Sequence, residues 1–218
     1  MHNARICAVI TDKDVESAHA VEHIVDLFEI RIDLVGKGWE KLPNKLHKPW
    51  IAANRDETHG GRWKGNEEDR IGELFKAIEL GANIVDMETD APGLGEFVSR
   101  IKEKAKCMIS FHDWEGTPPL DYLEGLVHQQ LSFHADICKV IATARTLDDN
   151  ITMLSLIKKF PWANIISFAM GTEGLLSRIM CPLAGGYLTY AAVKEGGGSA
   201  PGQITVDTMH NIYRMIEQ

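Results

Sequence analysis

Short apolar segments alternate with amphipathic segments along nearly the whole chain. The apolar runs are about four to eight residues long, which is typical of buried strands. The segments between them carry apolar residues at helical spacing, as Ile71, Leu74 and Ile78 do before Gly81. The pattern predicts strands over 5–10, 27–34, 49–55, 83–89, 106–112, 137–143, 164–170 and 184–190. It predicts helices over 67–80, 93–104, 118–133, 147–159 and 204–217, a first helix from an N-cap at Asp12 or Asp14 to Val25, and a short helical stretch opened by 171–177.

Strand and helix alternate eight times, which indicates βαβ units and therefore a parallel sheet. Eight such units within 218 residues predict an α/β fold, a closed (β/α)8 TIM barrel that forms one domain over residues 1–218. The alternative is a doubly wound open sheet. That fold usually carries a G-x-G-x-x-G loop after its first strand, and the segment after Ile10 has none.

Charged residues alternate with apolar ones in the predicted strand 27–34. Glu29, Arg31 and Asp33 fall on one face, because side chains of a strand point to opposite faces in turn. A half-exposed antiparallel strand would show this pattern, and so would a strand whose inner face lines a polar functional site. The pattern alone does not separate the two interpretations.

Lys139 stands in an otherwise apolar run, Ile137 to Ala142. Lysine is rarely buried without a partner or a task, because removing an ammonium group from water is costly. One interpretation is structural, with the side chain reaching solvent from a strand end or pairing with a buried carboxylate. The other is chemical, since a lysine amine in dry surroundings can attack a carbonyl carbon and form a Schiff base.

Composition narrows the class of partner. The formal net charge is −8 with both signs interspersed, so the basic face expected of a nucleic-acid-binding protein is missing. No signal-peptide pattern and no membrane-spanning apolar run is seen, so we expect a cytoplasmic protein without membrane contact. Four widely spaced cysteines predict buried, reduced thiols. The nine histidines lack H-x-x-x-H or H-E-x-x-H spacing, and we expect no metal site.

The unusual polar residues fall where the predicted strands end. The active sites of these barrels lie at the carboxyl ends of the strands and in the loops that follow. Taken singly, each residue has a structural explanation, such as a core histidine, a loop ion pair or a helix-cap acid. Together their cationic members would favour an anionic substrate. The set comprises Glu29, Arg31, Arg55, Asp86, Glu88, His112 and Lys139, with Arg178 after the seventh strand and Ser199 and Gln203 after the eighth.

Six motifs, in order along the chain, resemble those of the type I 3-dehydroquinate dehydratases of the shikimate pathway. Any one of them would be weak, but the combination of the histidine, lysine and final loop segments is specific. The motifs are FEIRID at 28–33, Asn54-Arg55 with Gly60-Gly61, SFHD at 110–113 with Thr117-Pro118, ICKV at 137–140, Met170-Gly171 with Ser177-Arg178, and SAPGQ at 199–203.

The resemblance implies a TIM barrel that uses no metal or organic cofactor and is commonly a homodimer. It implies that Lys139 forms an imine with the ring ketone of 3-dehydroquinate and that His112 acts as general base and general acid. Such roles suit the residues, because an iminium acidifies the neighbouring C–H and imidazole can move protons both ways near neutral pH. By the same resemblance Arg178, Ser199 and Gln203 hold the substrate carboxylate and hydroxyls, while Glu29, Arg31 and Arg55 complete the pocket. The glycines around Ser199 suggest a loop that closes over the substrate.

One position departs from the family pattern. The family carries a glutamate just before the paired glycines, and this chain has His59 there. That glutamate is thought to orient the catalytic histidine, so His59 joins Asp86 and Glu88 as candidates for supporting the catalytic pair. If His59 faces the site, it should lower the pKa of His112 relative to a chain bearing glutamate. The alternative is that His59 points to solvent from a flexible loop.

Two rival functions fit parts of the pattern. Class I aldolases and transaldolases also use a strand lysine in this barrel, although the His112 and SAPGQ segments disfavour them. A non-catalytic metabolite-binding barrel is the other rival, because a fold by itself does not fix function.

Overall fold

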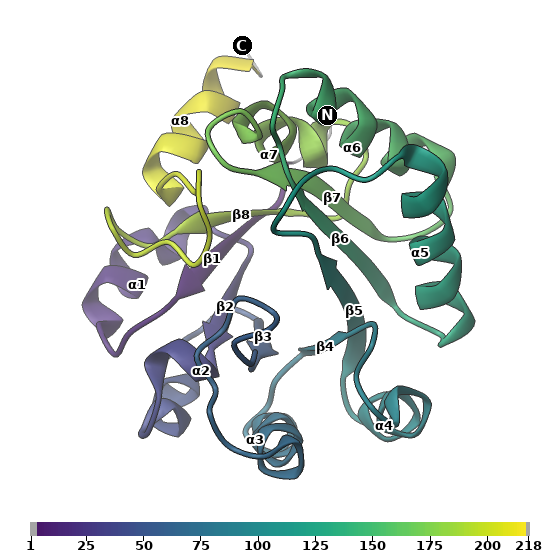
Figure 1. Ribbon diagram of the computed structural model, residues 1–218. Helices are drawn as coiled ribbons and strands as arrows, with labels where there is room; N and C mark the ends of the chain where they lie inside the picture. The colour runs from purple at the N-terminus through teal and green to yellow at the C-terminus, as the bar shows by residue number, and fades with distance from the viewer. Residues whose placement is uncertain (1–3, 217–218) are drawn as a thin grey trace.

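The computed structural model describes residues 4–216, in which eight parallel strands follow one another around a barrel (Figure 1). Each strand from β1 to β6 pairs with the next along the chain, and β8 pairs with β1, while no ladder among the described residues joins β7 to β8. This order has no reversal point of the kind found in a doubly wound sheet, so the open-sheet alternative is wrong and the predicted TIM barrel is confirmed. The strands are β1 (Ile6–Ile10), β2 (Leu27–Arg31), β3 (Trp50–Ala53), β4 (Ile84–Glu88), β5 (Lys106–His112), β6 (Ile137–Thr143), β7 (Ile165–Met170) and β8 (Thr189–Ala192).

Helices cover the outside of the barrel (Figure 1). The first helix begins after Asp14, whose Oδ1 accepts a hydrogen bond from Ser17 N at 3.2 Å, so Asp14 and not Asp12 is its N-cap. The predicted continuation to Val25 is a 3-10 turn, Glu22–Ile24. The helices are α1 (Val15–Val21), α2 (Ile32–Val35), α3 (Glu67–Glu79), α4 (Leu94–Ile101), α5 (Leu120–Ser132), α6 (Asp148–Lys159), α7 (Leu175–Leu183) and α8 (Val206–Ile216). Two further 3-10 turns, Trp39–Lys41 and Pro43–Lys45, precede β3 and were not predicted.

The alternation in β2 separates two buried faces. All five residues of β2 are buried between parallel neighbours, so the half-exposed antiparallel interpretation is wrong. Phe28 and Ile30 belong to the core under the helices, while Glu29 and Arg31 line the pocket inside the barrel. The strand ends at Arg31, and Asp33 lies in α2 instead of continuing the polar face.

The eighth strand begins later than predicted. Residues 184–188 were predicted to be its first part, but α7 runs to Leu183 and a glycine turn follows. Gly185 has a φ of 102°, and a Cβ on Gly186 would lie 2.5 Å from Cys181 Sγ. Tyr187 N then donates to Ile165 O at 2.7 Å and joins this segment to β7 before β8 begins. The apolar residues of 184–188 therefore belong to a packed turn.

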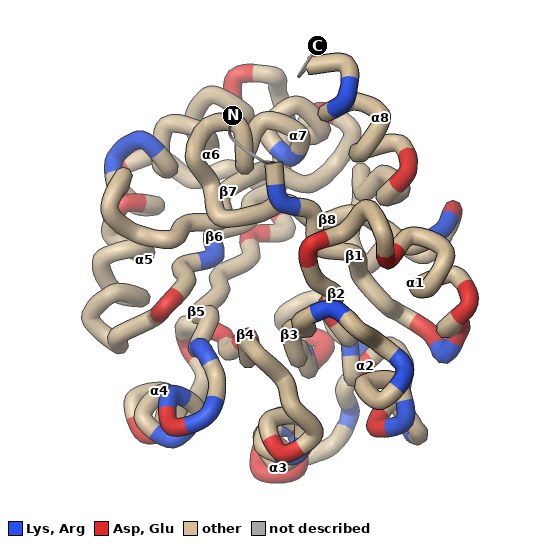
Figure 2. The backbone as a smooth tube through the Cα atoms, turned by 180° about the vertical axis from the view of Figure 1, so that it is seen from behind, with Lys and Arg blue, Asp and Glu red and all other residues tan. Residues whose placement is uncertain are grey.

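Surface and core agree with the compositional expectations. Cys7, Cys107, Cys138 and Cys181 are all buried and free, as predicted. Basic and acidic positions are mixed around the helices, and the view in Figure 2 shows no extended basic face. Among residues 4–216, no helix has the length and apolar character needed to cross a membrane.

Candidate active site

A pocket of about 440 Å³ lies at the carboxyl ends of the strands. It brings together nine of the predicted residues: Glu29, Arg31, Arg55, His59, His112, Lys139, Arg178, Ser199 and Gln203. The other two, Asp86 and Glu88, are buried beneath it and bind its cations. Sequence reasoning missed Trp114, Phe168 and Tyr190 in the wall. Trp114 stands two residues after β5, so the strand-end rule could have found it.

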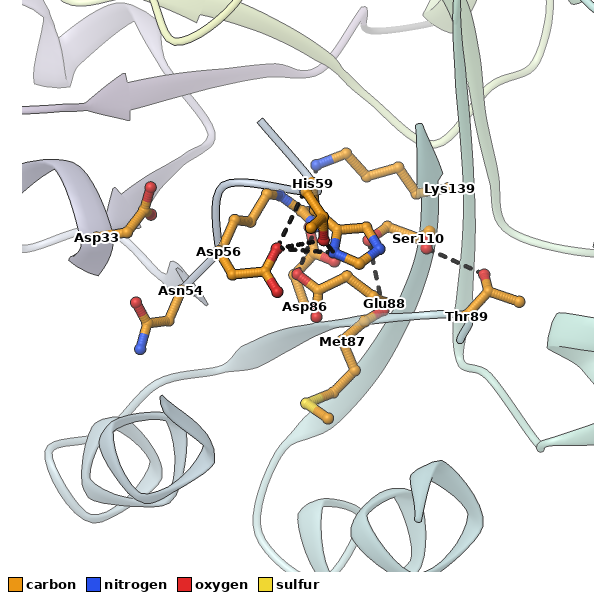
Figure 3. Close-up of polar contacts among 12 residues, drawn as sticks. Asp33, Asn54, Asp56, His59, Asp86, Met87, Glu88, Thr89, Ser110 and Lys139 are labelled. Atoms are coloured by element: carbon orange, nitrogen blue, oxygen red, sulfur yellow. Dashed lines mark hydrogen bonds and ion pairs between the residues drawn. The ribbon is translucent and has the colours of Figure 1, made fainter. Parts of the chain in front are cut away.

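Lys139 projects from the middle of β6 and is only 5% exposed. Its Nζ lies 3.0 Å from Asp86 Oδ2, and both of these side chains are labelled in Figure 3. It lies 3.6 Å from Glu29 Oε2. The ammonium also lies 4.4 Å from the centre of the Tyr190 ring. The lysine therefore does not reach bulk solvent. Its amine sits at the floor of the pocket, held by two carboxylates and an aromatic face.

Arg55 joins the carboxylates of β4 into one network. Its guanidinium donates to Asp86 at 2.5 Å and to Glu88 at 3.0 Å. Glu88 also accepts a hydrogen bond from Arg70 of α3 at 2.9 Å. Burial alone would raise the pKa of Asp86, but Arg55 and Lys139 lower it to about 2. Three buried carboxylates, Glu29, Asp86 and Glu88, thus face three cations, Arg55, Arg70 and Lys139, and this part of the site is balanced in charge.

His112 ends β5 with an unusual lack of polar contacts. Its Nδ1 is buried without a hydrogen-bond partner, and its ring stacks on Trp114 with the centroids 6.3 Å apart. A histidine kept only for packing would ordinarily have this nitrogen hydrogen-bonded. Burial, followed by the nearby charges of Arg55 and Lys139, holds the pKa of His112 well below its usual 6.5. The imidazole is therefore neutral at pH 7 and free to accept a proton.

Arg178 reaches the pocket from α7, not from the end of β7. It is 1% exposed, and its guanidinium lies 4.5 Å from the centre of the Phe168 ring. Among the described residues it has no acidic partner: Nη2 donates to Pro201 O at 3.3 Å and Nε is unsatisfied. Burial lowers its pKa from 12.5 to about 10. An unbalanced buried guanidinium of this kind is suited to a carboxylate that arrives with a ligand.

The loop between β8 and α8 closes one side of the pocket. Gln203 Oε1 accepts hydrogen bonds from Ser199 N at 2.7 Å and Ser199 Oγ at 3.3 Å. Lys194 fastens the start of the loop to Asp12 and Asp14 at 2.9 and 2.7 Å. The loop therefore presents Ser199 and Gln203 next to one another at the pocket wall.

His59 lies in the pocket wall, with its side chain 26% exposed, and does not project freely into solvent. Its Nδ1 is 3.0 Å from Asp56 Oδ1 and its Nε2 is 3.0 Å from Asp90 Oδ1. Asp56 and Asp90 therefore hold both ring nitrogens, as the cluster in Figure 3 shows for Asp56. Asp90 stands two residues after β4, so its position at a strand end was visible in the sequence, although its pairing with His59 was not.

Arg31 forms a two-point ion pair with one carboxylate. Its Nε and Nη2 donate to the two carboxylate oxygens of Asp33 at 3.0 and 2.8 Å. Asp33 also accepts a hydrogen bond from Arg62 N at 3.1 Å. Arg31 therefore contributes to the pocket as one half of a fixed ion pair, unlike Arg178.

Comparison with known proteins agrees with this arrangement. A model of the type I 3-dehydroquinase family matches residues 6–218. The chain is 43% identical over 217 residues to the 3-dehydroquinate dehydratase of Dehalococcoides mccartyi, covering 99% of this chain and 97% of the relative. It is 37% identical over 210 residues to that of Methanocaldococcus jannaschii, covering 94% of each.

The fold also matches a solved structure. The 3-dehydroquinate dehydratase of Geobacillus kaustophilus superposes with a TM-score of 0.86 at 23% identity, covering 99% of this chain and 91% of that one. The family match spans nearly the whole barrel, including every strand that contributes to the pocket. The chain belongs to the type I 3-dehydroquinase family.

Proposed function

We propose that this chain is a 3-dehydroquinate dehydratase that eliminates water from 3-dehydroquinate through a Schiff base on Lys139. One observation carries the assignment of roles. A buried amine, a neutral imidazole and an unbalanced guanidinium line one pocket in a chain of this family. These are the three groups that imine formation, proton transfer and carboxylate binding require.

Covalent bonding begins at Lys139. The Lys139 ammonium first gives up a proton to solvent, and the resulting amine attacks the ring ketone. A proton from solvent then lets the new hydroxyl group leave as water, and an iminium ion remains on the ring carbon. Glu29 and Asp86 lie 3.6 and 3.0 Å from Nζ and stabilise the positive charge that the nitrogen keeps in the iminium. Their position in the balanced network with Arg55 fixes the amine before the substrate binds.

Proton transfer follows at His112. The neutral imidazole removes a proton from the carbon next to the iminium, and the electron pair moves into an enamine. The enamine then expels the hydroxyl group, which takes the proton back from His112 and departs as water. Hydrolysis of the imine consumes a water molecule and releases 3-dehydroshikimate, so the net change is the loss of one water. A metal is not needed, because the iminium supplies the electrophile.

The residues on the Arg178 side of the pocket orient the substrate. Arg178 pairs with the carboxylate, and Ser199 and Gln203 contact hydroxyl groups. Arg55, Arg31 and Glu29 complete the polar wall. Support comes from Arg178 being the pocket arginine without an acidic partner among the described residues, whereas Arg31 and Arg55 are already paired.

The first test is ultraviolet absorbance. Adding 3-dehydroquinate should produce the absorbance of a conjugated enone at a rate proportional to enzyme. Aldol cleavage of sugar phosphates without enone formation would favour the aldolase alternative, and binding without turnover would favour a metabolite-binding barrel. A chelator should leave the rate unchanged.

The resemblance further supports a homodimer in the cytoplasm as the working form. Light scattering coupled to size-exclusion chromatography tests the dimer directly. A mass of one chain at assay concentration, with full activity, would remove the dimer from the proposal and leave the chemistry unaffected.

A further inference from the structure

Two histidines and a glutamate come together far from the pocket. His19 lies in α1, Glu22 opens the 3-10 turn that follows, and His47 precedes β3. One potential ligand atom of each lies within 4.8 Å of the others. The end of α1 and the segment entering β3 lie at the amino ends of the strands, whereas Lys139 and His112 face the carboxyl ends. The cluster is therefore separate from the catalytic chemistry.

Existing contacts hold the three side chains in place. Glu22 accepts a hydrogen bond from His47 N at 2.7 Å through one oxygen and lies 3.0 Å from His47 Nδ1 through the other. His19 Nε2 is 2.6 Å from Lys45 O, two residues before His47. The two imidazole rings are 6.1 Å apart between centroids. Ordering of the ligands before a metal arrives lowers the entropy lost on binding.

The donor set indicates which ion would fit. Two imidazole nitrogens with one carboxylate oxygen suit Zn²⁺, whereas Mg²⁺ and Ca²⁺ prefer oxygen ligands throughout. Bond lengths of about 2.0–2.1 Å place the donors of a tetrahedral zinc roughly 3.4 Å apart. The ligand atoms lie up to 4.8 Å apart, so zinc binding requires the exposed rings of His19 and His47 to turn toward Glu22.

We propose that His19, Glu22 and His47 bind one zinc ion, with water as the fourth ligand, and so clasp the end of α1 to the segment before β3. Ion binding to the folded state alone raises stability by mass action. This zinc takes no part in the dehydratase reaction, and its binding does not depend on the proposed function.

The test is zinc titration of tag-free, chelator-treated protein by calorimetry, with thermal melting in parallel. The wild type should bind one equivalent of zinc through this site. At free zinc one hundred times the Kd, the melting temperature should rise by about 5–10 °C. His47→Ala should weaken binding roughly a hundredfold or more and remove most of the thermal shift at the same zinc concentration. The His47 side chain is 81% exposed, so this variant should fold normally.

His23→Ala is the matched control, because His23 is also exposed, lies next to Glu22 and is not one of the three ligands. It should retain zinc binding and the thermal shift. Equal zinc affinity in wild type, His19→Ala and His47→Ala would overturn the proposal, as would the absence of saturable binding to the wild type. A chelator should remove the thermal shift while leaving enone formation unchanged.

Discussion

The two sides of the pocket differ in whether their buried cations are paired with carboxylates. Around Lys139 every cation has a carboxylate partner, since Arg55 and Lys139 contact Asp86 and Arg31 contacts Asp33. Around Arg178 the described residues supply no acidic partner. The difference separates chemistry from recognition. A balanced network can hold the reacting amine rigidly in dry surroundings, whereas an unbalanced cation leaves room for the negative charge of a substrate.

The largest expected effect is on the free energy of unfolding when Arg55 or Arg178 is replaced. Arg55→Met leaves Asp86 and Glu88 buried without their shared cation, which should lower the free energy of unfolding by about 3–5 kcal/mol. Arg178→Met removes a cation that burial disfavours, and should keep or raise the free energy of unfolding, by up to about 3 kcal/mol. Urea denaturation of the two variants measures both. Equal destabilisation would mean that Arg178 has a partner in the folded chain that the account omits.

Removal of the imidazole should have the next largest effect. His112→Ala should lower turnover by about 100-fold or more, the usual cost of a lost general acid–base group. Because His112 Nδ1 has no hydrogen-bond partner, the variant leaves no unsatisfied group there and should melt near the wild-type temperature. Turnover is followed by enone absorbance. Normal turnover would assign proton transfer to another residue.

The role of Arg178 in substrate binding is tested by replacing it with lysine. Arg178→Lys keeps the charge but replaces a planar two-point donor by a single ammonium, so the KM should rise by roughly tenfold or more. The kcat should change less, because Lys139 and His112 are untouched. An unchanged KM would move carboxylate binding to Arg31 or Arg55 and remove the contrast between the two sides.

The smallest expected effect concerns pH. A general base works only when unprotonated, so activity should fall as pH drops through the pKa of His112, which lies well below 6.5. His59 is among the charges that lower this pKa. His59→Glu should therefore move the acid limb of kcat/KM upward by a measurable fraction of a pH unit, with turnover largely kept. His23→Glu, at the other end of the barrel, is the control, and superimposable wild-type and His59→Glu profiles would make His59 irrelevant to His112.

The barrel could be predicted because each of its strands and helices follows from a local pattern of apolar and polar residues. Apolar runs followed by amphipathic helices recur eight times, and β5 and β6 have the bounds that their sequence predicts. The eighth strand was misplaced because the turn at Gly185 and Gly186 contains enough apolar residues to imitate a strand. Its true limits depend on tertiary packing against Cys181, which periodicity does not record.

The residues that line the site could be predicted from the sequence, but most of the contacts between their side chains could not. Strand ends place Lys139, His112 and Arg55 together whatever their rotamers. Whether Arg31 or Arg178 has an acidic partner depends on the positions of individual side chains, which periodicity does not record. The same is true of the contacts of His59 with Asp56 and Asp90. The His19, Glu22 and His47 cluster was invisible for the same reason, because His47 lies 25 residues from Glu22.

Covalent trapping tests the central claim most directly. Borohydride added with 3-dehydroquinate should inactivate the enzyme irreversibly and attach the reduced ligand to the peptide containing Lys139, as measured by mass spectrometry. His112→Ala should still be labelled, because imine formation precedes its proton transfer, whereas Lys139→Ala should be neither labelled nor active. Label on another lysine, or turnover by Lys139→Ala, would contradict the account.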